Sequence, residues 1–500
     1  MGSRERPITI VGAVVASAAL YSACFPPLGL HFLAWVALAP LLLALARLSW
    51  WEGFGVGCIW SLMVGLGTSS WLPAMISEYF GVSQATGWMA AAGATLGTGF
   101  LYGVFGLVTA TLSRGLVIDP WRAALVWGAC EYARTMGPIA NPWVLSGYTQ
   151  DPASSVAQSA DVWGVVGLGM LVMAVNAGVA SAMEGRLPGR WKWVRPVSVL
   201  SVLAIVIAYG SSRKTGIPSG AEGVEVVLVQ SATPRLQRFD DRYRGAKLAH
   251  VLDLVARAAG TSADVVFLPE LALDVPLDEQ TAEGRALLRI AEQGNVEVLA
   301  GAPARVGESP ATGMFNSFFL LRMDRVADRY DKVSLTPFSE RKPFRGWLEW
   351  GRDEYATGVS RRPLSSRMGG VGVLLCGEVM FGRHAREAVR LGARILSNPA
   401  NDSWFGSESA ARMQLDVAAM RAVETRRPLV RPTMTGVTAV IDAAGRVVVE
   451  APFGRPALLR ANVTPESSET AYVRLGDWAG AVSALATLVL VLGRLLASGP

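Results

Sequence analysis

The sequence predicts a membrane protein in two parts, a multi-spanning α-helical membrane domain of about eight spans and a polar α/β domain. Only 17% of the 500 residues are charged and the mean hydropathy is positive, which is unusual for a soluble protein of this length. The apolar residues gather in 1–210 and 477–497, whereas 223–466 has the mixed charge of a globular domain. We therefore expect seven transmembrane helices in 1–210, one in 477–497, and a separate domain in 223–466.

Eight apolar windows, each near the length needed to cross the hydrocarbon core, supply these spans. They lie at residues 8–24, 32–46, 54–71, 88–112, 121–132, 162–183, 194–209 and 478–496. The fifth window is the weakest, because it is short and has Glu131 and Arg134 at its end. It is retained because the alternation of charged and uncharged links between the windows requires a span there.

Charges in the links predict the orientation of the chain in a bacterial inner (plasma) membrane. Basic residues precede the first window and fill the links after the second, fourth and sixth, which the positive-inside rule places in the cytoplasm. They are Arg4, Arg6, Arg47, Arg114, Arg122, Arg186, Arg190, Lys192 and Arg195. The links 25–31 and 72–87 contain no lysine or arginine. The polar domain is therefore expected on the periplasmic side; Arg213 and Lys214 run against this count, which long translocated domains tolerate.

A cleavable signal peptide is an alternative interpretation of the first window. Arg4 and Arg6 precede it as in a signal sequence, but no A-x-A cleavage site stands directly before Phe25.

Cysteine and histidine usage narrows the possible chemistry. Cys376 is the only cysteine in the polar domain, which excludes a disulfide within it. The chain has only three histidines, which argues against a histidine-based triad or a zinc site, and we expect no metal or organic cofactor. The net charge of +6 comes with no basic surface interleaved with aromatic residues, so no nucleic-acid partner is expected.

In the polar domain, short β-rich runs alternate with helical stretches, which is typical of a layered α/β domain. The first runs are 224–230, 265–269 and 296–301, with helices expected at 246–259 and 282–293. Further runs lie at 317–321, 371–375, 394–396, 437–441 and 447–449. There are enough strands for two packed sheets.

Three segments present a chemically reactive side chain: Glu270 follows the run 265–269, Lys332 precedes a loop, and Cys376 follows the run 371–375. Taken singly, each is ordinary. A glutamate after a strand or a lysine in a loop is usually solvated, and a cysteine after a Val/Leu run is more often part of the core. Their combination in this order favours a catalytic triad.

The surrounding residues identify a family resemblance. The segments are Pro269-Glu270, Tyr330-Asp331-Lys332, Cys376-Gly377-Glu378, 401–406, 420–424 and 427–429. Their order resembles the carbon-nitrogen hydrolase (nitrilase) superfamily. Within it, the flanking spans and the segments 337–340, 436–440 and 463–478 resemble the apolipoprotein N-acyltransferase family over nearly the whole chain. The resemblance implies that 223–466 is a nitrilase-like αββα sandwich with catalytic Glu270, Lys332 and Cys376, supported by Glu340 and Glu378.

The triad suits acyl transfer through a covalent intermediate. A thiol is mostly protonated at neutral pH, so a nucleophilic Cys376 needs a base, a role that suits Glu270. Lys332 would stabilise the oxyanion that forms on the attacked carbonyl. As the resemblance implies, the donor is a phospholipid and the acyl group is carried as a thioester. The acceptor is the α-amine of a diacylglyceryl-cysteine at the start of an apolipoprotein, and the enzyme is expected to be a monomer.

The sequence also departs from the family pattern. Gly377 stands where the family has Tyr and Gln414 where it has His, and further differences lie at 231–232, 339 and 434–435. None of them removes a triad member. A charged loop contains Phe344, Trp347, Leu348 and Trp350, which would suit either a lid on the membrane interface or a contact with the core.

Two alternatives from other functional classes stay open at this point. A membrane-anchored amidase or nitrile-processing hydrolase would use the same triad with water as the acceptor. Eight spans favour acyl transfer over this alternative, since one span would tether a hydrolase. A catalytically silent membrane scaffold or lipid-binding protein is the second alternative, and the presence of all three triad residues argues against it.

Overall fold

The computed structural model describes residues 5–497 apart from 114–117, 138–139, 185–190, 216–222, 234–240, 308–312, 345, 348–350 and 352–354. The chain divides into two compact units. One consists of Met1–Thr215 with Leu475–Pro500, and the other of Gly216–Arg474. Each unit is described by itself.

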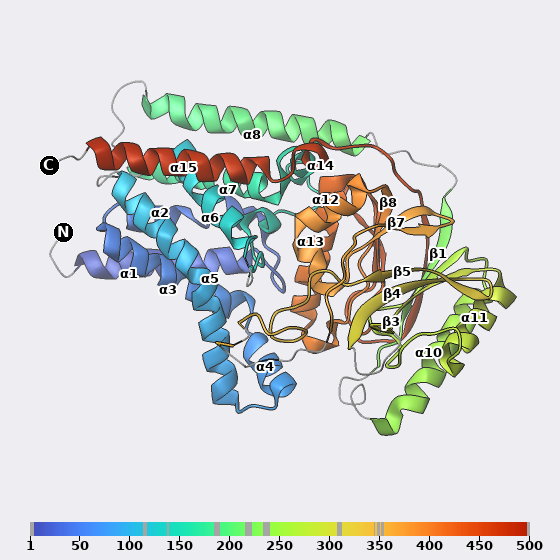
Figure 1. Cartoon of the computed structure of the whole chain (residues 1–500). Helices are drawn as coiled ribbons and strands as arrows, with labels where there is room; N and C mark the ends of the chain where they lie inside the picture. The colour runs from blue at the N-terminus through green and yellow to red at the C-terminus, as the bar shows by residue number, and fades with distance from the viewer. Residues whose placement is uncertain are drawn as a thin grey trace. The chain divides into compact units, whose positions relative to one another are not determined.

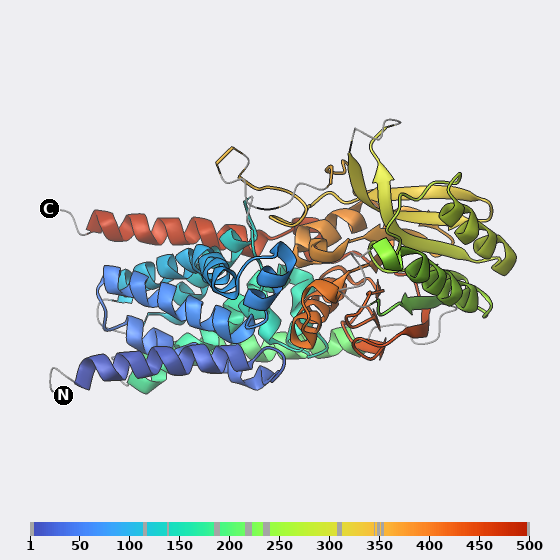
Figure 2. The same ribbon diagram turned by 90° about the horizontal axis from the view of Figure 1, so that it is seen from below.

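The first unit is helical, and most of its helices run alongside one another (Figures 1 and 2). Its helices are α1 (Glu5–Ala23), α2 (Ala39–Leu45), α3 (Trp50–Thr68), α4 (Leu72–Phe80), α5 (Gln84–Ser113), α6 (Pro120–Arg134), α7 (Ala160–Glu184), α8 (Trp191–Thr215) and α15 (Trp478–Ala497). Short 3-10 helices lie at His31–Trp35, Ser146–Thr149 and Ala157–Ser159. Each of the eight apolar windows thus contains helix.

The structure supports the predicted spans in part. Among the described residues, four helices are long and apolar enough to cross a membrane: Gln84–Ser113, Ala157–Glu184, Val194–Lys214 and Trp478–Ala497. A fifth span results if α3 and α4, which meet at a bend of 73°, count as one. Among the described residues, the other windows hold shorter helices. α6 has 15 residues, which rise only about 22 Å against a hydrocarbon core of about 30 Å, and window 32–46 is broken between a 3-10 helix and α2.

The charged residues that made the fifth window weak have partners inside this unit. The Glu131 carboxylate accepts hydrogen bonds from Ser146 N at 2.6 Å and Ser146 Oγ at 2.9 Å. Arg134 donates to Tyr102 Oη at 2.6 Å and to the Trp143 carbonyl at 2.5 Å. These bonds satisfy backbone groups of the non-helical segment after α6, which an apolar side chain could not do.

Arg213, which runs against the predicted charge pattern, is also paired. Its Nε donates to Asp161 Oδ2 at 2.9 Å, and the Asp161 side chain is buried. Because Tyr209 Oη donates to the other oxygen of this carboxylate at 2.8 Å, the end of α8 is tied to the start of α7.

The second unit contains two six-stranded sheets, as the alternating pattern predicted. The first has the order β12-β1-β2-β3-β4-β5 and the second β11-β10-β9-β8-β7-β6. The strands of the first are β1 (Val224–Gln230), β2 (Val265–Phe267), β3 (Glu297–Arg305), β4 (Met314–Arg322), β5 (Arg325–Asp331) and β12 (Ala457–Val463). Those of the second are β6 (Leu364–Ser366), β7 (Gly369–Val373), β8 (Ala393–Ser397), β9 (Leu429–Arg431), β10 (Ala439–Ile441) and β11 (Val447–Glu450).

Helices cover both sheets (Figure 1). α10 (Arg244–Ala259) and α11 (Ala282–Gly294) pack on the first sheet, where Val255 and Leu287 join Val266 and Val298 in one apolar cluster. α12 (Gly382–Arg390) and α13 (Glu408–Thr425) pack on the second. Residues of both sheets, such as Phe318 and Ile395, share another cluster. The unit therefore has four layers, helix, sheet, sheet and helix.

Candidate active site

Glu270 lies three residues beyond β2, in a turn pressed against β3. A Cβ atom on Gly301 of β3 would lie 2.4 Å from the Pro269 carbonyl oxygen and 2.8 Å from Glu270 Cα. Only glycine allows β3 to approach so closely. Leu271 follows with a φ of +47°, in the left-handed region. The backbone therefore fixes the direction in which the Glu270 side chain leaves the sheet.

The buried Glu270 carboxylate has three partners from separate parts of the domain. Oε1 accepts from Lys332 Nζ at 3.0 Å and from Asn316 Nδ2 at 2.9 Å, and Oε2 accepts from Asn401 N at 3.1 Å. Asn316 is the third residue of β4, and its Nδ2 also donates to Glu340 at 2.8 Å. Sequence reasoning missed Asn316, although a lone amide in an apolar strand was an available signal.

Lys332 follows β5 directly, and its side chain is only 1% exposed. Its ammonium contacts Glu270 at 3.0 Å and Glu340 at 2.9 Å. Burial by itself lowers the pKa of Lys332, but these two carboxylates outweigh it and hold the pKa well above its ordinary value. Lys332 is therefore a fixed cation. The cluster carries one positive and two negative charges.

Glu340, expected from the resemblance to support the triad, is buried beside Lys332. Burial raises its pKa, but the Lys332 ammonium and the hydrogen bond from Thr336 N, at 2.7 Å, outweigh this effect and lower it. The structure thus brings Glu270, Lys332 and Glu340 together.

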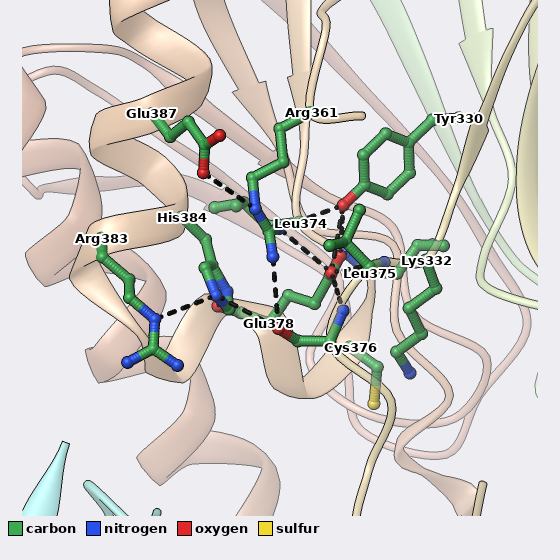
Figure 3. Close-up of polar contacts among 12 residues, drawn as sticks. Tyr330, Lys332, Arg361, Leu374, Leu375, Cys376, Glu378, Arg383, His384 and Glu387 are labelled. Atoms are coloured by element: carbon green, nitrogen blue, oxygen red, sulfur yellow. Dashed lines mark hydrogen bonds and ion pairs between the residues drawn. The ribbon is translucent and has the colours of Figure 1, made fainter. Parts of the chain in front are cut away.

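Cys376 lies three residues beyond β7 and begins a short 3-10 helix (Cys376–Met380). Its φ of +47° is in the left-handed region, where a side chain is strained. Figure 3 shows its thiol and the Lys332 amine pointing to the same side. Burial raises the pKa of the thiol, Glu270 raises it further, and Lys332 opposes them without cancelling their effect. The cysteine is therefore held as a neutral thiol beside the group that could remove its proton.

Glu378 is fully buried, and Figure 3 shows its contacts with Tyr330 and Arg361. It accepts from Tyr330 Oη, from the backbone N–H groups of residues 333, 334 and 375, and from Arg361, at 2.9 to 3.2 Å. Its partners thus come from the end of β5 and from the residue before Cys376. Glu378 ties the two sheets together where Lys332 and Cys376 leave them. Sequence reasoning did not identify its partner Arg361.

The expected lid is described only in part. Trp347 is 97% exposed, which agrees with a surface aromatic rather than a core contact. The ring of Phe344 lies 6.4 Å from that of Phe338. Leu348 and Trp350 lie outside the described residues.

Comparisons with known proteins cover nearly the whole chain. The family model described as the apolipoprotein N-acyltransferase N-terminal domain matches residues 17–178, and the carbon-nitrogen hydrolase model matches 241–472. The apolipoprotein N-acyltransferase of Geobacter metallireducens is 30% identical over 502 residues, covering 96% of this chain and 95% of that protein. The chain belongs to the apolipoprotein N-acyltransferase family. It is an acyltransferase of the membrane, which removes the silent scaffold from the alternatives, and its polar unit has the nitrilase-like fold.

Other relatives agree with this assignment. The apolipoprotein N-acyltransferase of Rhodopseudomonas palustris is 29% identical over 486 residues, covering 90% of this chain and 86% of that protein. Among solved structures, Nit3 of Saccharomyces cerevisiae, a member of branch 10 of the nitrilase superfamily, is 18% identical with a TM-score of 0.40. It covers 50% of this chain and 93% of that one.

Proposed function

We propose that this acyltransferase moves an acyl chain from a phospholipid to Cys376 as a thioester, and then to the N-terminal amine of a diacylglyceryl apolipoprotein. The observation that supports it most directly is the buried Glu270–Lys332 ion pair, set beside the strained turn that presents the Cys376 thiol. The pair supplies both a proton acceptor and a fixed positive charge. Neither would be needed for an inert buried cysteine.

In the first half-reaction, Cys376 Sγ attacks the ester carbonyl carbon of the donor while its proton passes to Glu270. Attack by a neutral thiol has to be coupled to this transfer, because burial, and after it the Glu270 carboxylate, raises the pKa of Cys376 and disfavours a free thiolate. The carbonyl oxygen becomes an oxyanion, which Lys332 stabilises. When the intermediate collapses, the C–O bond breaks and the leaving alkoxide takes the proton from Glu270. The products are the thioester and a lysophospholipid.

In the second half-reaction, the neutral α-amine of the acceptor attacks the thioester carbonyl. The amine loses one proton to Glu270, and Lys332 again stabilises the oxyanion. Collapse breaks the C–S bond, and the Cys376 thiolate takes the proton back from Glu270. The amide product leaves and the enzyme returns to its starting state, so no metal or organic cofactor takes part.

Glu340 and Asn316 act as supports in this scheme. Both contact the ion pair through buried hydrogen bonds, so the Lys332 ammonium cannot turn away from the position where the oxyanion forms. The departures Gly377 and Gln414 leave this machinery intact. We infer that they affect the acceptor, because a side chain next to the nucleophile would line the space that the second substrate enters.

We further propose that the chain acts as a monomer in the inner membrane, with eight spans and the catalytic unit in the periplasm. Reporter fusions after Ser211 should give a periplasmic signal, and fusions after Arg186 a cytoplasmic one, since the basic links mark the inner side. A cytoplasmic signal after Ser211 would remove one span from this topology, in the first place α6.

The proposed chemistry is tested by incubating the purified enzyme with phospholipid alone. A hydroxylamine-sensitive thioester should form on Cys376 and be absent in Cys376→Ala and Glu270→Ala. Lys332→Ala should slow its formation roughly a hundredfold or more, the effect of losing an oxyanion donor worth about 2.7 to 4 kcal/mol. Mass spectrometry of a diacylglyceryl peptide then tests the transfer step. If folded enzyme forms no thioester from mildly acidic to alkaline pH, while releasing ammonia from short amides, the membrane-anchored hydrolase replaces this proposal.

A further inference from the structure

The strained turn at Cys376 has to be held by its surroundings. A residue with a Cβ atom in the left-handed region costs about 1 to 3 kcal/mol and persists only where neighbouring contacts enforce it. The backbone N–H of Cys376 donates to the Pro399 carbonyl at 2.8 Å, which fixes one side of the turn. The carbonyl groups of Leu374 and Cys376 face the other side.

Asn398, the residue directly after β8, holds these two carbonyls. Its Nδ2 donates to Leu374 O at 2.5 Å and to Cys376 O at 3.2 Å, and its side chain is fully buried. An amide nitrogen has only two hydrogens, so both are used on the backbone that flanks the nucleophile. The Asn398 side chain therefore bridges the turn from Leu374 to Cys376.

Arg431, the last residue of β9, holds Asn398 in turn. One of its terminal nitrogens donates to Asn398 Oδ1, and the other donates to Asp402 Oδ2 at 2.8 Å and to Gln414 Oε1 at 3.0 Å. The Arg431 side chain is entirely buried. Because a guanidinium is planar and rigid, these bonds fix the spacing between Asn398 and Asp402.

The segment between those two residues contacts both reactive groups. Pro399 O accepts from the nucleophile's backbone, as described above, and Asn401 N donates to Glu270 Oε2 at 3.1 Å. Movement of this segment would therefore change the position of Cys376 relative to Glu270.

We propose that Asn398 and Arg431 form a clamp that keeps the Cys376 turn in its strained conformation and in register with Glu270. The hydrogen bonds described above for both residues go to the backbone around Cys376, to each other or to other side chains, and not to the Cys376 thiol. Both are therefore positioning residues. Stabilisation of the fold does not by itself explain why Arg431 is buried here. A buried ion pair often makes a protein no more stable than apolar side chains of equal volume would. This inference rests on Cys376 being the nucleophile of the proposed function.

Asn398→Asp is the direct test, because it keeps the shape and the acceptor for Arg431 but removes both bonds to the turn. Gln230→Glu is the matched control. Gln230 is also a fully buried amide, and its Nε2 donates to two backbone carbonyls, Pro452 O and Arg455 O, each at 2.7 Å. It has the same chemistry in the same unit, but its described contacts do not include the Cys376 turn. Arg431→Lys is a second test that keeps the positive charge, in case Asn398→Asp does not fold.

Three quantities are measured on the full-length enzyme in detergent. They are the thermal midpoint, the rate of thioester formation at saturating phospholipid, and the pH profile of Cys376 alkylation by iodoacetamide, followed on the Cys376 peptide. We expect Asn398→Asp to slow thioester formation at least tenfold and to move the alkylation profile to higher pH, because the thiol moves away from Lys332. Gln230→Glu should lower the thermal midpoint to a similar extent but keep the wild-type profile. Arg431→Lys should resemble Asn398→Asp.

The inference is overturned if Asn398→Asp and Arg431→Lys keep the wild-type rate and profile. It is also overturned if Gln230→Glu moves the profile as far as Asn398→Asp does, since a buried carboxylate alone would then explain the effect. Alkylation requires no acyl transfer, so failure of the proposed function remains distinguishable. In that case wild-type enzyme would form no thioester, while the two clamp variants would still shift the alkylation profile.

Discussion

Glu270→Gln should separate the reactivity of the Cys376 thiol from the catalytic activity of the enzyme. The substitution removes one negative charge from the cluster of Glu270, Lys332 and Glu340 and keeps the shape of the side chain. Because Glu270 raises the pKa of Cys376 and Lys332 lowers it, the variant should have a lower thiol pKa than the wild type. It also loses the group that accepts the proton during catalysis. Simple alkylation should therefore become faster while acyl transfer is lost.

The size of the effect follows from the charge that is removed. One unit charge at about 5 Å, in a medium with an effective dielectric constant of about 20, is worth roughly 3 kcal/mol. Each 1.4 kcal/mol is about a tenfold change in the thiolate population, which gives an upper value near a hundredfold. Rearrangement of Lys332 towards Glu340 will reduce this figure. We expect alkylation near pH 8 to be at least about tenfold faster in Glu270→Gln.

The assay compares iodoacetamide alkylation of the partly exposed Cys376 with thioester formation from phospholipid, both as functions of pH. In the wild type the pKa of the thiol is raised, so its alkylation rate should still increase tenfold per pH unit through pH 9. In Glu270→Gln the pH dependence of the alkylation rate should be shifted to lower pH. Glu340→Gln is the matched control, because it removes a charge from the same cluster but keeps the base. It should also speed alkylation, yet form more thioester than Glu270→Gln. Slower alkylation in Glu270→Gln would refute the charge assignment.

Further predictions concern the surroundings of the triad. Trp347→Ala should slow turnover of membrane phospholipid more than that of a soluble short-chain ester, because the indole is exposed; an equal loss on both would mean a structural role. Gly377→Tyr should change transfer to a diacylglyceryl peptide but leave thioester formation within a few fold, since among the described residues a Cβ there meets only Thr336 Oγ1, at 3.7 Å; parallel losses in both steps would contradict this. Glu378→Gln should lower stability by about 3 to 5 kcal/mol, because Arg361 loses its buried partner; an unchanged thermal midpoint would refute it.

The sequence predicted the layered α/β domain because alternation of apolar strands and amphipathic helices is local information. It missed β5, β6, β9 and β12 for the same reason. The strand Arg325–Asp331 contains Arg325, Asp328 and Arg329, and its burial pattern shows a mostly solvated edge strand rather than an apolar run. Its register against β4 still decides where Lys332 lies, and pairing across a sheet is not visible in local composition.

The number of spans shows the limit of hydropathy. Each of the eight predicted windows contains helix. The length of these helices, and the points at which they are interrupted, depend on packing within the unit. The window at 32–46 is interrupted because Asn176 of α7 accepts from Leu38 N and Ala39 N and donates to Ala34 O. A side chain from another helix thus satisfies the backbone there, and no property of the window itself predicts it.

At the site, the sequence by itself determined which residues are predicted to react, because the order of the motifs selects Glu270, Lys332 and Cys376. Only the tertiary structure decided their environment. It placed Glu340 on Lys332 and Glu378 away from it, although both are carboxylates near motif residues. It also brought in Asn316, Asn398 and Arg431. Asn316 lies 46 residues from Glu270 along the chain, and Asn398 and Arg431 lie 22 and 55 residues from Cys376. Buried polar groups must find partners wherever the fold brings them, and those partners come from distant strands that only the packed sheets bring together.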